Sequence, residues 1–250
     1  ELADRRGGAR YGLGALGASV AGNPAIVAMV EHHALFYADL RDPVALLRGE
    51  AGDTALAAYW PYAGAMTPAG LPADRVAAYS TLMAASQSLV AGQVVAAYPL
   101  SSHQCVLDVG GGEGAFLEAV AGHVPSLQLR LFDLPAVADR ATARFAATGL
   151  AGRATAHGGD FLVDPLPAGA DLVTLVRVLH DHDDARVRTL LGAVRRALPK
   201  GGTVLIAEPL RDAPDAATVG AAYFAFYLLA MGRGRPRSVA ELAILLQAAG

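Results

Sequence analysis

Residues Cys105–Gly114, with the sequence CVLDVGGGEG, decide the fold of this chain. A short apolar run that contains Asp108 is followed by a cluster of glycines and then by a helical pattern at residues 115–120. This order is typical of a buried parallel strand, a tight turn and a helix whose N-terminus faces a ligand. Glycine permits positive φ and has no Cβ, so a ligand can lie directly against the backbone. The stretch therefore predicts a ligand site at a strand–helix turn.

The sequence that follows alternates between strand-like and helical runs. Strand-like runs fall at residues 105–109, 127–133, 153–157, 171–176 and 203–208. Helical runs fall between several of them, at residues 114–123, 135–147 and 184–198. Such alternation is typical of βα units on a parallel sheet with right-handed crossovers. We therefore predict an α/β fold with a Rossmann-like parallel-sheet domain over residues 99–250.

The first 98 residues are expected to form a mostly helical substrate or dimerisation domain, because no chemistry of its own is visible in its sequence. A small hairpin or wing is predicted within residues 1–22, and a helical pattern follows over residues 23–48. A short helix should end near Trp60-Pro61-Tyr62, and a long one should run from Pro72 to Tyr98. The adjacent His32 and His33 point in different directions on a helix, so we expect satisfied surface or core side chains rather than a pair of ligands.

Composition limits the classes of function. The chain is 54% hydrophobic and 17% charged, which suits a globular protein, and its net charge of -3 gives no reason to expect nucleic acid. The single cysteine, Cys105, excludes disulfides and cysteine-based zinc sites and favours a reduced, cytoplasmic location. The apolar run Ala221–Met231 is too short to span a bilayer and predicts a buried helix. Because the sequence starts at Glu1 and stops at Gly250 just after an amphipathic helix, we expect a fragment.

Two cofactors compete for the glycine turn. Residues 110–115 fit the NAD fingerprint G-x-G-x-x-A, and Asp133 lies about 20 residues further on, as that fingerprint requires. Residues 108–114 also fit the methyltransferase pattern D-x-G-x-G-x-G, through Asp108, Gly110, Gly112 and Gly114. A dinucleotide pyrophosphate favours a positive helix end without a nearby carboxylate. S-adenosylmethionine carries ammonium and sulfonium charges and no phosphate, so an acid at Asp108 favours this second cofactor.

Acids at two further strand ends strengthen that hypothesis. Asp133 closes the second strand ahead of Leu134, where a carboxylate can accept both ribose hydroxyl groups. Asp160 follows Gly159 after the third strand and can accept the adenine amino group, while Phe161 covers the ring. Each acid alone could be a helix cap or a loop residue, and this alternative is strongest for Asp160. Together the three acids favour S-adenosylmethionine.

The fourth strand leads into Arg177, which we assign to the cofactor site, and then to His180, where a methyl acceptor would approach. A histidine with a pKa near 6.5 can remove the proton of a hydroxyl nucleophile. Glu208, at the end of the fifth strand, can orient the imidazole, and we place Asp181 in the same catalytic group.

The remaining polar residues of this segment have simpler interpretations. We expect His182 to face solvent, and Asp183 or Asp184 to cap the next helix. A metal site in this cluster is an alternative, but no ligand spacing is diagnostic, so we predict none.

These motifs together resemble the class I small-molecule O-methyltransferases that include the caffeate, isoflavone and acetylserotonin enzymes. The resemblance rests on residues 108–114, 131–135, 159–161, 178–181 and 207–209. It implies an N-terminal helical, winged-helix dimerisation domain, here partial, over residues 1–98, and an S-adenosylmethionine domain over residues 99–250 that lacks its last strands. It also implies that His180 is the catalytic base, that Glu208 is its carboxylate partner, and that the protein is a homodimer.

Other segments resemble the bacterial carotenoid branch, the hydroxyneurosporene or demethylspheroidene O-methyltransferases. They are residues 31–34, 37–40, 42–45, 60–62, 175–179 and 231–238. This resemblance implies a small apolar hydroxylated substrate, an acyclic carotenoid with a tertiary hydroxyl group at C1, and allows peripheral membrane association through a lipophilic substrate. The alternatives are an aromatic, polyketide or bacteriochlorophyll precursor as acceptor, or a non-catalytic protein that binds S-adenosylmethionine.

Overall fold

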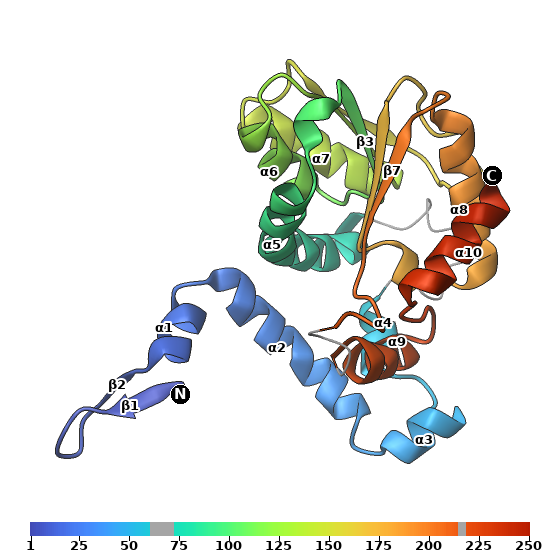
Figure 1. The fold of residues 1–250 in the computed structure, drawn as a ribbon. Coiled ribbons are helices and arrows are strands. Elements are labelled where there is room, and N and C mark those ends of the chain that lie inside the picture. Colours follow the sequence, from blue (N-terminus) through green and yellow to red (C-terminus); the bar gives the residue numbers. More distant parts are fainter. Residues whose placement is uncertain (61–72, 215–218) are drawn as a thin grey trace.

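A five-stranded parallel sheet forms the centre of the computed structural model, which describes residues 1–60, 73–214 and 219–250 (Figure 1). The strands are β3 (Cys105–Val109), β4 (Gln128–Asp133), β5 (Ala154–Gly158), β6 (Leu172–Val176) and β7 (Thr203–Ala207). They lie in the order β5-β4-β3-β6-β7, and every neighbouring pair is parallel. The order reverses between β3 and β6, so a topological switch point lies at the carboxyl ends of these two strands. The predicted α/β fold is confirmed, and each strand begins and ends within one residue of its expected position.

Helices cover both faces of this sheet (Figure 1). The helices on one face are α5 (Ala73–Ala97), α6 (Ala115–His123) and α7 (Pro135–Ala147), and those on the other are α8 (Asp184–Ala197) and α10 (Val239–Ala249). Strand β3 serves both faces, because Val106 packs with the first group of helices while Leu107 and Val109 pack with the second. All five residues of β3 are buried, as expected for a strand covered on both sides.

The N-terminal residues form an arm that extends away from the sheet domain (Figure 1). The predicted hairpin is present as β1 (Ala3–Arg5) and β2 (Tyr11–Leu13), and it is followed by α1 (Ala15–Ala21). The pattern at residues 23–48 forms two helices, α2 (Pro24–Asp39) and α3 (Pro43–Arg48). The break falls where Asp42 accepts a hydrogen bond from the Ala45 amide and Pro43 starts the new helix. The predicted short helix is α4 (Ala55–Tyr59), which ends just before Trp60. Pro61 and Tyr62, and the expected helix start at Pro72, lie outside the described residues.

The chain after the sheet returns to this helical part. A π-helical turn (Val219–Tyr223) leads into α9 (Phe224–Met231), which contacts α2, α3 and α4 (Figure 1). His32 is a core residue here, since it is buried and its Nε2 lies 2.7 Å from the Tyr227 hydroxyl. His33 is satisfied by the Tyr223 hydroxyl, so both histidines turn toward the same helical segment rather than apart. The division into domains at residue 98 stays a prediction.

No helix among the described residues has both the length and the apolar character needed to cross a bilayer.

One carboxylate joins the amino ends of β3 and β6. Asp171 accepts hydrogen bonds from the Cys105 amide at 2.7 Å and from the His103 ring at 2.9 Å, and His103 in turn contacts the Tyr98 hydroxyl at 2.8 Å. Burial alone would raise the pKa of Asp171, but the hydrogen bonds from Cys105 and His103 hold the pKa below its ordinary value. This stabilisation is therefore present at neutral pH and is lost as the pH falls through the lowered pKa of the folded state.

Replacing Asp171 with asparagine is expected to lower the free energy of unfolding by about 1 kcal/mol, because the two strand ends lose a charged hydrogen-bond acceptor. The loss stays this small because solvent partly screens the side chain. Denaturant unfolding of Asp171→Asn, with the exposed Asp139→Asn as a control, measures the difference. The difference should shrink as the pH is lowered; a difference that stays constant down to acidic pH would contradict the role of the carboxylate.

Candidate active site

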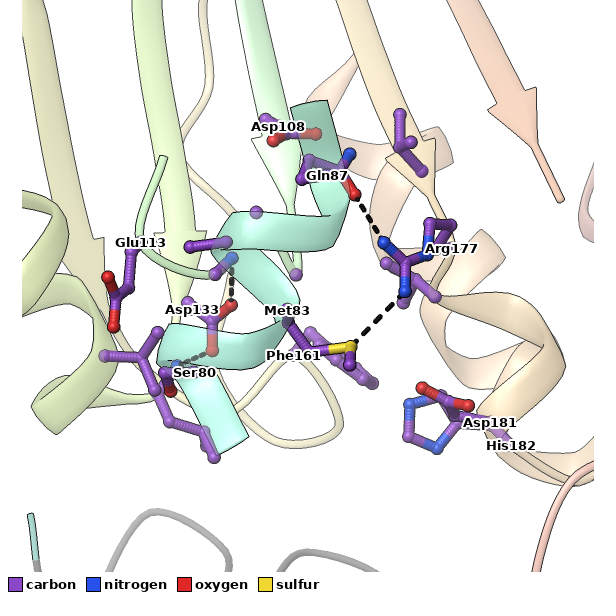
Figure 2. A pocket seen from close by; sticks show the side chains of 18 of the residues that line it. Ser80, Met83, Gln87, Asp108, Glu113, Asp133, Phe161, Arg177, Asp181 and His182 are labelled. Atoms are coloured by element: carbon purple, nitrogen blue, oxygen red, sulfur yellow. Dashed lines mark hydrogen bonds between the residues drawn. The ribbon is translucent and has the colours of Figure 1, made fainter. Parts of the chain in front are cut away.

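A pocket lies at the carboxyl ends of the strands, beside the switch point (Figure 2). The glycine turn after β3, the turns after β4, β5 and β6, helix α5 and the segment after α9 all contribute to its wall. The predicted site residues that line it are Asp108, Gly110, Gly112, Asp133, Leu134, Asp160, Phe161, Arg177 and Asp181. The other predicted site residues, Gly114, Gly159, His180 and Glu208, lie outside this lining.

The glycine turn depends on its glycines for two different reasons. Gly110, Gly112 and Gly114 all have positive φ, at 71°, 59° and 81°, which other residues rarely adopt. A Cβ on Gly110 would lie 2.8 Å from the Val178 side chain, and one on Gly114 would lie 2.6 Å from the ring of Phe145. Gly112 has nothing within 4 Å of its would-be Cβ. Gly110 and Gly114 thus let the turn pack closely against Val178 and Phe145, while Gly112 presents bare backbone to the pocket.

Asp108 is a buried acid with one unsatisfied oxygen. Its Oδ1 accepts a hydrogen bond from the Thr174 hydroxyl at 2.7 Å, whereas its Oδ2 is buried without a hydrogen-bond partner among the described residues. Burial raises the pKa of Asp108 to about 7, although the Thr174 hydrogen bond opposes the shift. A buried carboxylate is costly unless it is paired. The pocket therefore offers a cation-binding group below the glycine turn, which disfavours a pyrophosphate at the same place.

Asp133 fixes the glycine turn from the next strand. Its two oxygens accept hydrogen bonds from the Gly112 amide at 2.8 Å and from the Leu134 amide at 2.7 Å (Figure 2). Burial raises the pKa of Asp133 to about 6 despite these two bonds. Each carboxylate oxygen has a second lone pair, so the side chain can accept further hydrogen bonds from a ligand in the pocket.

The wall beyond β5 corrects one expectation about His182. Asp160 accepts a hydrogen bond from the Leu162 amide at 2.9 Å, so it stabilises the loop in which it lies, as the loop-residue alternative expects. Asp160 also lines the pocket. His182 does not face bulk solvent: it lines the pocket and contacts the Phe161 ring edge-to-face, with ring centroids 5.3 Å apart. The chain leaves its short helical turn extended at His182, and this brings the ring against Phe161. Burial, with Arg186 nearby, lowers the pKa of His182 to about 4, so the ring is neutral at neutral pH.

Helix α5 of the helical half supplies one wall of the pocket. Arg177, which has an unusual positive φ of 60°, donates hydrogen bonds to Ser86 at 2.9 Å and to Gln87 at 3.1 Å. Its other terminal nitrogen lies 3.3 Å from the sulfur of Met83 (Figure 2). Met83 and Gln87 line the pocket. The strained Arg177 thus ties the helical half to the sheet at the pocket.

His180 lies between two carboxylates in the turn Leu179–Asp181 after β6. Its Nδ1 is 2.5 Å from Oε2 of Glu208, and its Nε2 is 3.1 Å from Oδ1 of Asp181, an ion-pair distance without hydrogen-bond alignment. Burial alone would lower the pKa of His180, but Asp181 and Glu208 raise it overall. Burial raises the pKa of Asp181 to about 6. The predicted pairing of His180 with Glu208 is present, and it occupies Nδ1, so Nε2 is the nitrogen that faces Asp181.

Several contributors to the pocket were not predicted from the sequence, among them His182, helix α5, and Arg233 after α9. Arg233 Nη1 is buried without a hydrogen-bond partner among the described residues. Among those residues, no group of three or more His, Cys, Asp and Glu side chains is arranged to hold a metal ion.

The parallel sheet, the glycine turn after β3 and the acids at or near the carboxyl ends of β3, β4 and β5 define a Rossmann-like protein of the methyltransferase class. A family model described as an O-methyltransferase domain matches residues 37–250. The chain belongs to this O-methyltransferase family.

Individual relatives agree with this assignment. The chain is 46% identical over all of its length to a demethylspheroidene O-methyltransferase of Cereibacter sphaeroides, and 45% identical over 91% of its length to the Rhodobacter capsulatus protein of the same name. It covers 65% and 56% of the length of these curated relatives. A crystal structure of the O-methyltransferase NcsB1 from neocarzinostatin biosynthesis, in complex with S-adenosylmethionine and 2-hydroxy-5-methyl naphthoic acid, superposes with a TM-score of 0.67 at 29% identity. That match covers all of this chain and 75% of the other.

Proposed function

We propose that the protein is an S-adenosylmethionine-dependent O-methyltransferase that methylates the C1 tertiary hydroxyl group of an acyclic carotenoid. The observation that carries the cofactor is the buried, unpaired Oδ2 of Asp108 beneath the glycine turn. The names of the two relatives at 46% and 45% identity support the acceptor.

The residues around the pocket fit this cofactor. Asp108 provides a negative group for the ammonium end, Asp133 has free lone pairs for the ribose hydroxyls, and Asp160 with Phe161 provides an edge and a ring for the adenine. Gly112 leaves space for the ligand against the backbone. When bound, the cofactor supplies an electrophilic methyl group on a sulfonium.

The contribution of the protein is to align and deprotonate the acceptor. Glu208 holds Nδ1 of His180, so Nε2, beside Asp181, is the nitrogen that would take the hydroxyl proton while the methyl group passes from the sulfonium sulfur, which leaves as a neutral thioether, to the acceptor oxygen. Because a tertiary alcohol is a weak acid, proton removal and C–O bond formation take place together. Near-attack alignment of the oxygen behind the methyl group can supply about 7–11 kcal/mol of the barrier.

The apolar side chains in the wall suit a long hydrocarbon acceptor. Trp60, Met83, Val137 and Met231 line the pocket beside the charged residues. An aromatic acceptor is the second candidate, favoured by the solved relative that holds a naphthoic acid. We also propose a cytoplasmic location, because the single cysteine, Cys105, is free and buried. The resemblance to the family implies a homodimer, and a lipophilic substrate implies that the protein meets it at a membrane surface.

A side-by-side assay tests the acceptor class. The protein is incubated with methyl-labelled S-adenosylmethionine and either a 1-hydroxy carotenoid or a panel of phenols and hydroxynaphthoic acids. We expect the label in a methoxy group of the carotenoid, and transfer to the phenols alone would overturn the carotenoid assignment. Boiled protein is the control for chemical methylation.

A further inference from the structure

The turn that carries His180 needs partners from outside. It is a single 3₁₀ turn, Leu179–Asp181, so its first amides and last carbonyls have no partners in a continuing helix. On the amide side, Oε1 of Glu208 accepts hydrogen bonds from the Val178 amide at 2.8 Å and the Leu179 amide at 2.6 Å. Glu208 therefore binds the imidazole with one oxygen and the backbone of the same turn with the other.

The segment 234–238, between α9 and α10, supplies the partners on the carbonyl side. Arg237 donates from Nη1 to the Leu179 carbonyl at 2.6 Å and from Nη2 to the His182 carbonyl at 2.7 Å. The Arg235 amide donates to the carbonyl of His180 itself at 2.9 Å. This approach requires Gly234, since a Cβ at that position would overlap the His180 carbonyl oxygen. The turn is thus held by a carboxylate at its amide end and a guanidinium at its carbonyl end.

The guanidinium of Arg237 is buried, with 3% of the residue exposed, and is neutralised locally. Its Nε and Nη2 donate to Oδ1 of Asp184 at 3.0 Å and 2.7 Å. A buried charge is tolerated only when it is paired and hydrogen-bonded. The planar fork of arginine can bind two carbonyls and a carboxylate at once, which the single ammonium of lysine does less well.

We propose that Arg237 is a positioning residue that holds the His180 turn so that the imidazole meets both Glu208 and the acceptor hydroxyl. This inference rests on the proposed function. The 2.5 Å contact between His180 and Glu208 exists only while the backbone of the turn stays in place. A misplacement of about 1 Å can cost about 100-fold in rate, even when it originates far from the chemistry. Arg237 is not among the residues that line the pocket, so we expect its effect to pass through the turn that carries His180.

Steady-state kinetics of Arg237→Met test this role. We expect kcat to fall by about 10–100-fold, while the Kd for S-adenosylmethionine and the KM for the acceptor stay within about threefold of wild type. Arg237→Lys should recover part of kcat. The control is Arg195→Met, which removes an exposed guanidinium that donates to the Gly250 carbonyl at 2.6 Å; it should keep wild-type kcat. A folded Arg237→Met with wild-type kcat, or with a parallel loss of cofactor affinity, would overturn the proposal.

A second measurement needs no turnover. The pKa of His180 is read from its Cε1 proton by NMR titration, with the signal assigned by its absence in His180→Ala. Asp181 and Glu208 raise this pKa and Arg177 lowers it, so losing the Glu208 contact should bring the pKa down toward its ordinary value. Removal of a positive charge alone would move it up. An unchanged or higher pKa in Arg237→Met would overturn the positioning role, whether or not the wild type transfers a methyl group.

Should Arg237→Met fail to fold, Gly234→Ala disturbs the same turn without removing a charge. The added Cβ presses on the His180 carbonyl, so this variant should also show lower kcat and a lower pKa of His180 with cofactor affinity kept. Wild-type values of both quantities in Gly234→Ala would contradict the proposal. If the wild type itself methylates no acceptor, the proposed function fails while the pKa comparison still decides the positioning role.

Discussion

Replacing His180 with alanine is expected to lower kcat about 10²–10⁴-fold, the usual contribution of a general base. Glu208 holds Nδ1 at 2.5 Å, and the substitution removes the imidazole that is proposed to take the acceptor proton. Affinity for S-adenosylmethionine should stay near wild type, because His180 lies outside the pocket lining. Steady-state assays together with calorimetric titration of the cofactor separate the two effects, and the exposed His123→Ala is a matched control.

The pH profile should identify the same group. Since Asp181 and Glu208 together raise the pKa of His180, the imidazole loses its proton only above its ordinary pKa of about 6.5. A general base works when deprotonated, so kcat should rise with pH through an apparent pKa above that value. Turnover of His180→Ala within a few-fold of wild type would reject the base and leave alignment of the acceptor as the main mechanism.

Replacing Asp108 with asparagine is expected to weaken S-adenosylmethionine binding by about 30-fold or more, since a buried charged partner of a cation is typically worth at least about 2 kcal/mol. The loss should appear in the Kd of the cofactor. Thr174→Val is the comparison variant: it removes the 2.7 Å hydrogen bond to Oδ1 but keeps the carboxylate, so at a pH well above the pKa of Asp108 it should bind the cofactor more tightly than Asp108→Asn does. Equal Kd values for Asp108→Asn and wild type would contradict the role of Asp108.

The same site should make cofactor binding depend on pH. Burial raises the pKa of Asp108 to about 7, so below this pH the free protein carries a neutral acid and must release a proton to bind a cation. Affinity should therefore decline by up to about tenfold per unit as the pH falls below the pKa. Asp133, with a pKa of about 6, should cause a second decline in cofactor affinity at lower pH. Asp108→Asn should remove the decline in affinity below about pH 7 and keep the decline that Asp133 causes at lower pH.

The sheet and the cofactor side of the site could be predicted because their signals are local. A five-residue apolar strand, a glycine turn and an acid at a strand end each lie within a few consecutive residues, and the parallel sheet brings such strand ends together. Asp108 and Asp133 therefore lie where the sequence places them. The contact between His180 and Glu208 follows from the same rule, because both residues follow neighbouring strands.

The rest depends on contacts between distant residues, which have no local pattern. Arg177 reaches Ser86 across 91 positions, and Arg237 reaches Leu179 across 58. His182 looked solvent-exposed because acids flank it on both sides, whereas the direction of its ring is set by the turn and by Phe161. The break between α2 and α3 does have a local signal, because Asp42 caps the new helix and Pro43 occupies its first position.

A single-turnover measurement tests the central claim most directly. The protein, in excess, is loaded with methyl-labelled S-adenosylmethionine, mixed with the hydroxylated carotenoid and quenched over time. Wild type should move the label into a methoxy group, while His180→Ala should retain the bound label and transfer it at least about 100-fold more slowly. A wild-type protein that binds no cofactor, or a His180→Ala variant that transfers the label at the wild-type rate, would contradict the account.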